Sequence, residues 1–205
     1  MNSIKSLILI ASCSAVVGCA SMTPTTERIE SYAIYNVQPN EGITTGEISN
    51  AIEEEVRKEM SEVRINSKIP PSPLPEEPPR FKMTDAFSDT QLGALAAASG
   101  NSLSVPSCEE AVMTLKADDT SMSQYGENTV FHLCLQPYTE GYNIDIYTAF
   151  TKKSGGFSAA TLGATLARSV TGDSSQFLPR TIDGIVTGVE EAGAEVTLVE
   201  SYPPE

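Results

Sequence analysis

The sequence predicts an α+β protein in which amphipathic helices pack on an antiparallel sheet. Three observations support this fold class. Apolar residues alternate with polar ones through much of residues 111–150, which predicts a meander of three strands. Apolar residues recur at helical spacing in residues 45–64 and 176–191. Runs of β-branched and aromatic residues at 32–37 and 195–199 add one strand at each end of the domain.

The first predicted helix has a defined start. Thr44 and Glu47 match a capping box, in which the threonine hydroxyl accepts from a helix amide and the carboxylate accepts from the cap backbone. Glu53 with Arg57, and Glu54 with Lys58, form favourable pairs four residues apart on the outer side, where Glu55 is also expected in solvent. The apolar stripe is expected to pack on the sheet, and the alternative is a partner helix; its members are Ile48, Ala51, Ile52, Val56, Met60 and Val63.

A proline-rich arm at residues 69–79 follows this helix and holds six of the 13 prolines. Neither a helix nor a central strand persists through such a segment, so polyproline II conformation is expected. We expect the arm to cross over the domain, and the alternative is recognition of its Pro-x-x-Pro spacing by an aromatic groove. A short strand at 80–83 and a helix at 91–98 are predicted next.

The meander places two different sets of side chains on the faces of its second strand. Val130, His132 and Cys134 share one face, because residues two apart in a strand point the same way. After the third strand, small residues at four-residue spacing predict a helix at 158–170. The helix at 176–191 follows, with Pro179 in its first turn.

Length and charge narrow the classes of function. The chain has 205 residues and a net charge of −14, and residues 28–205 suit a single α+β domain. Nucleic-acid binding requires clustered Lys and Arg, whereas the 13 basic residues of this chain are scattered. The composition therefore predicts no nucleic-acid partner.

The amino terminus has the pattern of a secretory signal. Lys5 precedes an apolar run at residues 7–17 that is too short to span a membrane, and Cys19 follows it. The sequence Val16-Val17-Gly18-Cys19 resembles the lipobox of bacterial lipoprotein precursors, with two positions before a small residue and the cysteine that becomes lipidated.

This resemblance implies a location. Residues 1–18 would be a cleaved signal peptide, Cys19 would carry a diacylglyceryl group and an acyl chain such as palmitate, and residues 19–27 would be a tether. Ala20 and Ser21 replace the aspartate that favours inner-membrane retention in this family. The outer membrane is therefore implied, with the domain facing the periplasm; the inner membrane and the cell surface are the alternatives.

Two of the four cysteines remain available for a disulfide in the mature domain. Cys13 leaves with the signal and Cys19 is assigned to lipid, so Cys108 and Cys134 remain. An even remainder in an oxidising compartment predicts a disulfide between them, placed as a staple at the sheet edge.

Catalytic patterns are absent from the sequence. His132 is the only histidine, which rules out a His-rich zinc site, and there is no Gly-x-Ser-x-Gly elbow. His132 lies two residues before Cys134, but we expect it to be a half-buried sheet residue. The sequence thus predicts a noncatalytic lipid-anchored envelope protein, without cofactor or metal, that binds an envelope protein partner. The alternatives are a carrier of a small or lipidic ligand and an envelope hydrolase that uses His132.

Overall fold

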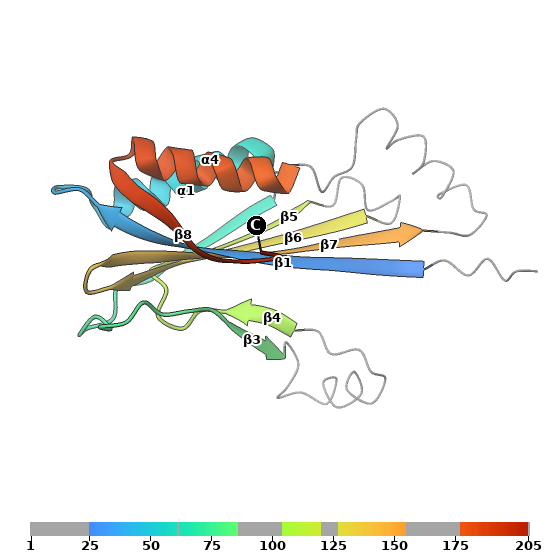
Figure 1. The fold of residues 1–205 in the computed structure, drawn as a ribbon, viewed down its shortest axis with the longest axis horizontal. Helices are drawn as coiled ribbons and strands as arrows, with labels where there is room; N and C mark the ends of the chain where they lie inside the picture. The colour runs from blue at the N-terminus through green and yellow to red at the C-terminus, as the bar shows by residue number, and fades with distance from the viewer. Residues whose placement is uncertain (1–24, 61, 86–103, 120–126, 155–176, 205) are drawn as a thin grey trace, which may run out of the picture.

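The structure, a computed structural model, describes residues 25–60, 62–85, 104–119, 127–154 and 177–204. Six antiparallel strands form one sheet in the order β2-β5-β6-β7-β1-β8, and two helices cover one of its faces (Figure 1). A two-stranded sheet of β3 and β4 lies on the opposite face, called the far face below. The predicted α+β class with an antiparallel sheet is confirmed. The elements are β1 (Thr25–Pro39), α1 (Thr45–Glu59), β2 (Glu62–Ser67), β3 (Lys82–Asp85), β4 (Ser104–Ser107), β5 (Met113–Asp119), β6 (Glu127–Tyr138), β7 (Gly141–Ser154), α4 (Phe177–Glu191) and β8 (Ala194–Tyr202).

Strand β1 is longer than the predicted run at residues 32–37. It pairs with β7 in one uninterrupted register from Thr25 opposite Ser154 to Val37 opposite Tyr142. Residues 25–27, expected to be part of the tether, therefore belong to the sheet. The first residues of β1, at positions 25–28, are all polar, so no alternation of apolar and polar residues predicts a strand there. Their pairing with β7 decides the conformation.

Helix α1 begins as predicted but ends earlier. The Thr44 side chain accepts from the Glu47 N–H, and the Glu47 carboxylate accepts from the Thr44 N–H at 2.8 Å, which completes the capping box. The helix ends at Glu59, and Met60 is already extended. The prediction of a helix to residue 64 was wrong, because residues 62–67 form the edge strand β2 paired with β5. Met60 and Val63 are three residues apart, a spacing that fitted the helical stripe by coincidence.

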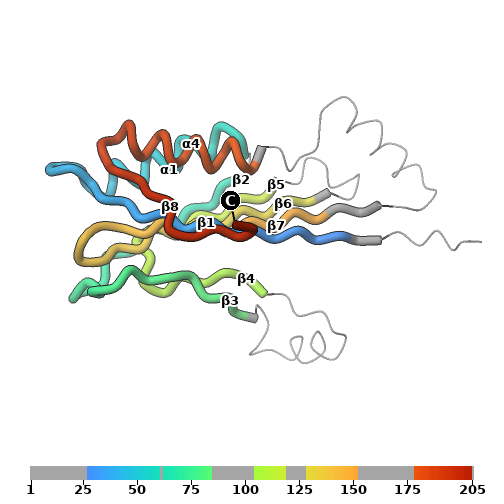
Figure 2. Tube along the Cα trace, viewed as in Figure 1, coloured from blue at the N-terminus to red at the C-terminus, as the bar shows by residue number. Residues whose placement is uncertain are grey.

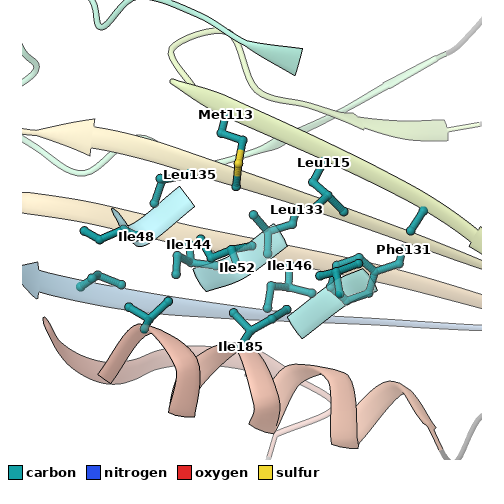
Figure 3. Packing of buried hydrophobic residues seen from close by; sticks show 14 of the residues in the cluster. Ile48, Ile52, Met113, Leu115, Phe131, Leu133, Leu135, Ile144, Ile146 and Ile185 are labelled. Carbon is teal, nitrogen blue, oxygen red and sulfur yellow. The ribbon is translucent and has the colours of Figure 1, made fainter. Parts of the chain in front are cut away.

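The main core lies between the helices and the sheet (Figure 3). Ile48, Ile52 and Val56 of α1 are fully buried, and Ile185 and Val189 of α4 join them. The apolar faces of the three meander strands supply most of the rest of the core, and Val37 of β1 joins them. Each such side chain contributes about 1.5–3 kcal/mol on burial. The sheet contributes Met113, Leu115, Ala117, Phe131, Leu133, Leu135, Ile144 and Ile146.

The two helices approach each other through glycines. A Cβ placed at Gly184 or Gly188 of α4 would lie 3.0 Å from side-chain atoms of Glu55 in α1. Lys58 binds the Glu55 carboxylate at 2.5 Å, and the Glu55 side chain is only 21% exposed. The expectation that Glu55 is a solvated charge was wrong, because its carboxylate lies against Gly184 and its Cγ lies against Gly188. The outer pair of Glu53 and Arg57 forms as predicted, at 2.7 Å.

The proline-rich arm runs across the far face without helix or strand (Figure 1). The Thr139 N–H donates to the Pro75 carbonyl at 3.0 Å, which ties the arm to the turn between β6 and β7. The helices expected at 91–98 and 158–170 lie outside the described residues. Within the described ranges, no helix has the length and apolar character needed to cross a membrane.

Candidate functional site

The two domain cysteines form a disulfide, as predicted. Their Cα atoms are 6.3 Å apart, and both side chains are buried. The bond does not lie at the sheet edge, however. Cys108 follows β4 and Cys134 lies in β6, a central strand, so the disulfide fastens the two-stranded sheet onto the far face. Cys19 lies outside the described residues.

His132 is a buried residue of the far face. Its Nδ1 is 3.7 Å from the Sγ of Cys134, whose sulfur is held in the disulfide. Burial, together with the nearby Lys116 charge, lowers the pKa of His132 to about 4. The imidazole is therefore neutral at physiological pH, and the adjacent sulfur is not a thiolate. This geometry gives the pair no nucleophile.

A buried polar cluster on the far face holds the end of the proline-rich arm. The Asp145 carboxylate accepts from the Phe81 N–H at 2.6 Å and from the Gln136 side-chain amide at 2.8 Å. The Pro79 carbonyl accepts from the amides of Gln136 and Asn143, at 3.2 and 3.4 Å. Proline has no N–H, and the arm forms neither helix nor strand. These side chains therefore supply donors for the carbonyl at its end.

The same cluster leaves two oxygens unsatisfied. Asp145 Oδ1 and Asn143 Oδ1 have no hydrogen-bond partner within the described structure, although both residues are only 1% exposed. Burial raises the pKa of Asp145 to about 6, against the opposing effects of the Phe81 amide and the Arg80 charge. Sequence reasoning placed Asn143 and Asp145 on one strand face but did not assign them a role. One feature of the sequence pointed to them: two polar residues alternate with Ile144 and Ile146 of the core.

Four aromatic rings gather where the arm meets β1, β7 and β8. The rings of Tyr32 and Phe81 are 5.8 Å apart, edge to face, and Phe81 meets Tyr147 at 6.3 Å in the same geometry. Tyr202 stacks on Tyr32 at 6.0 Å. They border a hollow of about 230 Å³, the aromatic hollow, which is lined by Glu30, Ser31, Tyr32, Phe81, Met83, Tyr147 and Tyr202.

Charges at the rim of the aromatic hollow are paired. Arg28 binds Glu30 at 2.5 Å and reaches the Tyr147 hydroxyl at 3.2 Å. The Tyr32 hydroxyl donates to Glu200 at 2.7 Å, and this hydrogen bond raises the pKa of Tyr32. The hydrogen bond from Arg28 lowers the pKa of Glu30. The rim therefore offers fixed carboxylates and hydroxyls beside apolar rings.

A second hollow, called the apolar hollow below, lies on the face of β1 that is covered by α4. It consists of two adjoining spaces of about 270 and 180 Å³. Both are lined by Ser31 of β1, Thr148 of β7, and Pro179 and Ile182 of α4. Ile29, which is 51% exposed, borders the smaller space. Sequence patterns did not indicate either hollow, because each combines residues from three or more separate segments.

The strand between the two hollows has one side open. Strand β8 pairs with β1 only from Pro39 to Tyr32, where Tyr202 is its last partner. Among the described strands, β7 alone pairs with residues 25–31, called the free edge of β1 below. Figure 2 shows β1 continuing past the end of β8. Backbone groups, aromatic rings and apolar side chains thus meet in one place.

The chemistry of this region suits recognition. In the described part of the chain, no group of three or more His, Cys, Asp or Glu side chains lies close enough to hold a metal ion. The free edge provides backbone donors and acceptors, and the hollows provide apolar contact on both faces. No protein-family model matches the sequence, and comparison with curated proteins finds no significant relative.

Proposed function

We propose that this protein is a noncatalytic, lipid-anchored envelope protein that binds a partner protein on the periplasmic side of the outer membrane. One observation carries the proposal: three of the large exposed apolar side chains, Ile29, Met83 and Tyr202, line the hollows on either side of β1. Scattered exposed apolar residues are ordinary, whereas clustered ones mark interaction sites. Tyr, Met and Arg are also the residue types enriched at protein interfaces.

The anchor supports a location beside lipid. If Cys19 is the lipidated amino terminus, β1 begins 25 − 19 = 6 positions later. At an extended length of about 3.5 Å per residue, those positions reach about 20 Å. The free edge is the first part of the domain after the anchor, so its partner is expected close to the membrane surface.

The two alternative functions are less well supported. Sites for small molecules usually enclose about 300–1,000 Å³ and bury most of the ligand's surface. The aromatic hollow, at about 230 Å³, is smaller than that range. The two adjoining spaces of the apolar hollow together reach the range, but their rim is exposed at Ile29. The space between sheet and helices is filled by the main core. A hydrolase that uses His132 would need an accessible imidazole, whereas His132 is 5% exposed. Partner binding is therefore the function that we propose.

Replacement of the lipobox cysteine tests the anchor. The Cys19→Ser variant is expected to lose its lipid and to appear as an uncleaved precursor or as a soluble protein, because stable attachment requires more than one acyl chain. Fractionation of envelopes after a high-salt wash, with mass measurement of the mature chain, checks this. Cys13→Ser, within the same apolar run, is the control and should remain membrane-bound. A Cys19→Ser protein that stays with the lipid would contradict the anchor.

Site-specific photocrosslinking in intact envelopes tests partner binding. A photoreactive amino acid at Tyr202, which is 57% exposed, is expected to give a discrete crosslinked product. The same photoreactive amino acid in place of Ile69, which lies in the arm and is 92% exposed, is the control and should give no crosslinked product. Equal products at the two positions, or none at Tyr202, would argue against a partner at this site.

A further inference from the structure

Three stretches of the six-stranded sheet lack a neighbour on one side within the described structure: the outer sides of β2 and β8, and the free edge of β1. Exposed edges invite pairing with other chains, and proteins protect them with short strands, charges and bulges. Strand β2 has six residues and exposes Glu62 and Arg64. Strand β8 exposes Glu195 and Glu200, and its register with β1 shifts at Ile34.

The free edge of β1 lacks a bulge. Its register with β7 is continuous, and residues 27–30 are exposed, including Ile29 at 51%. In an antiparallel strand, every second residue directs both its N–H and its C=O to the same side. The free edge therefore presents about three pairs of backbone donors and acceptors to the open side.

Side chains from the free edge border a hollow on each face. Ile29 and Ser31 share one face and line the apolar hollow beside α4. Glu30 and Tyr32 share the other and line the aromatic hollow. The side chains of an added strand also alternate between faces. Such a strand would lie on the same side of β1 as β8 and would begin where β8 ends. Pro203, the residue after β8, has no N–H with which to continue the pairing.

We propose that the free edge of β1 binds an extended segment of a partner protein as an added antiparallel strand. The segment has apolar side chains facing α4, an Arg or Lys side chain opposite Glu30 over the aromatic hollow, and an uncharged residue opposite Arg28. Backbone hydrogen bonds supply affinity in this mode, and pockets for alternate side chains supply specificity. This inference rests on the proposed function.

Charge defines the chemistry of the partner segment. The chain carries a net charge of −14, which disfavours an acidic segment. A basic side chain over the aromatic hollow would contact Tyr32 and Tyr202 through a cation–π interaction. It would share Glu30 and Glu200 with Arg28 and Arg80, which already bind them. The stem of Arg or Lys also packs well on apolar rings.

A second copy of this chain is a poorer occupant. The symmetric antiparallel register that uses the whole free edge places residue 25 opposite residue 31, and therefore Arg28 opposite Arg28 of the other copy. Like charges directly opposite each other destabilise a strand pair. Registers shifted toward β8 meet Tyr32, whose open side β8 already occupies.

Binding of synthetic peptides to the mature, lipidated protein in detergent tests the proposal. The probes are fluorescent peptides of about seven residues, with Val, Ile or Phe alternating with Arg or Thr. Each has a partner of the same composition in shuffled order. At least one alternating peptide is expected to bind about tenfold more tightly than its shuffled partner. It should also protect backbone amides of residues 25–31 from hydrogen exchange.

Backbone chemistry and matched variants sharpen the test. N-methylation of the peptide at the residues that face β1 should weaken binding about tenfold, and methylation at the intervening residues should be tolerated. Ile29→Asn should also weaken binding, whereas Val199→Asn should not. Val199 is the matched control, because it is likewise 51% exposed but lies on β8 outside both hollows.

Four results would overturn strand addition: no alternating peptide binds, the shuffled peptides bind equally, N-methylation has no effect, or sedimentation shows dimers that Ile29→Asn dissociates. Failure of the two proposals is distinguishable. If photocrosslinking at Tyr202 yields a partner while no alternating peptide binds, partner binding stands and strand addition fails. If neither experiment gives a product, the proposed function fails as well.

Discussion

Asp145→Asn is expected to raise the free energy of unfolding by about 3 kcal/mol at pH 7. Burial holds the pKa of Asp145 at about 6, compared with its ordinary value of 3.8. Each pKa unit corresponds to about 1.4 kcal/mol, so keeping this carboxylate ionised in the fold costs about 3 kcal/mol. An asparagine oxygen still accepts from the Phe81 N–H and from Gln136. The asparagine side chain carries no charge, so the burial penalty of the carboxylate disappears.

Urea unfolding of the variant and the wild type at pH 7 measures this effect. Asp183→Asn is the matched control, because it makes the same chemical change at an exposed position of α4. The control should change stability by less than about 0.5 kcal/mol. A loss of stability in Asp145→Asn would mean that the ionised carboxylate, rather than its burial, dominates the interaction with the arm.

The pH dependence of the same variant provides a second check. Because the pKa of Asp145 is raised in the folded protein, its contribution to the free energy of unfolding is fully present below about pH 4. That contribution is lost as the pH rises through about 6. The pH effect of His132 runs in the opposite direction. Its pKa is lowered from 6.5 to about 4, so its contribution to the free energy of unfolding is lost as the pH falls through that range. The two effects oppose each other in the wild type. Asp145→Asn should therefore show a steeper loss of stability on acidification than the wild type.

Removal of the disulfide is expected to lower the free energy of unfolding by about 3 to 4 kcal/mol. The bond closes a loop with a sequence separation of 26, and chain entropy gives about this value for such a loop. The double variant Cys108→Ala/Cys134→Ala avoids leaving polar groups at two buried positions. Denaturant unfolding of the variant, compared with the wild type under oxidising conditions, measures the change.

Reduction of the wild type is the control for this prediction. If the chain entropy of the closed loop is the cause, the reduced wild type and the double variant should have similar stability. The loss should also be reflected in faster hydrogen exchange at β3 and β4, because the disulfide joins them to β6. Equal stability of the oxidised wild type and the double variant would contradict the prediction.

The sequence predicted most of the secondary structure where local chemistry determines it. The capping box fixed the start of α1, and alternation fixed the three meander strands. Errors occurred where two patterns coincide or where no pattern exists. Val63 fitted a helical stripe and a strand equally well, and the first residues of β1 are polar. In both places the pairing partner, β5 or β7, decides the conformation.

The candidate site was less accessible to sequence reasoning. The lipobox is a linear motif, so Cys19 remains a prediction that the sequence makes by itself. The pairing of Cys108 with Cys134 also followed from counting cysteines. The free edge of β1 and its two hollows depend on where β8 ends relative to β1 and on where the arm and α4 lie. No local pattern contains that information.

The sequence by itself thus determined the α+β class, the two described helices, the meander and the disulfide pairing, because each depends on local periodicity or on a short count. Only the tertiary structure decided that the disulfide fastens a second layer to the far face, and that Asp145 is buried under the proline-rich arm. It also decided that residues 25–31 of β1 extend beyond β8. These features depend on strand order and register, which arise from contacts between segments far apart in the chain.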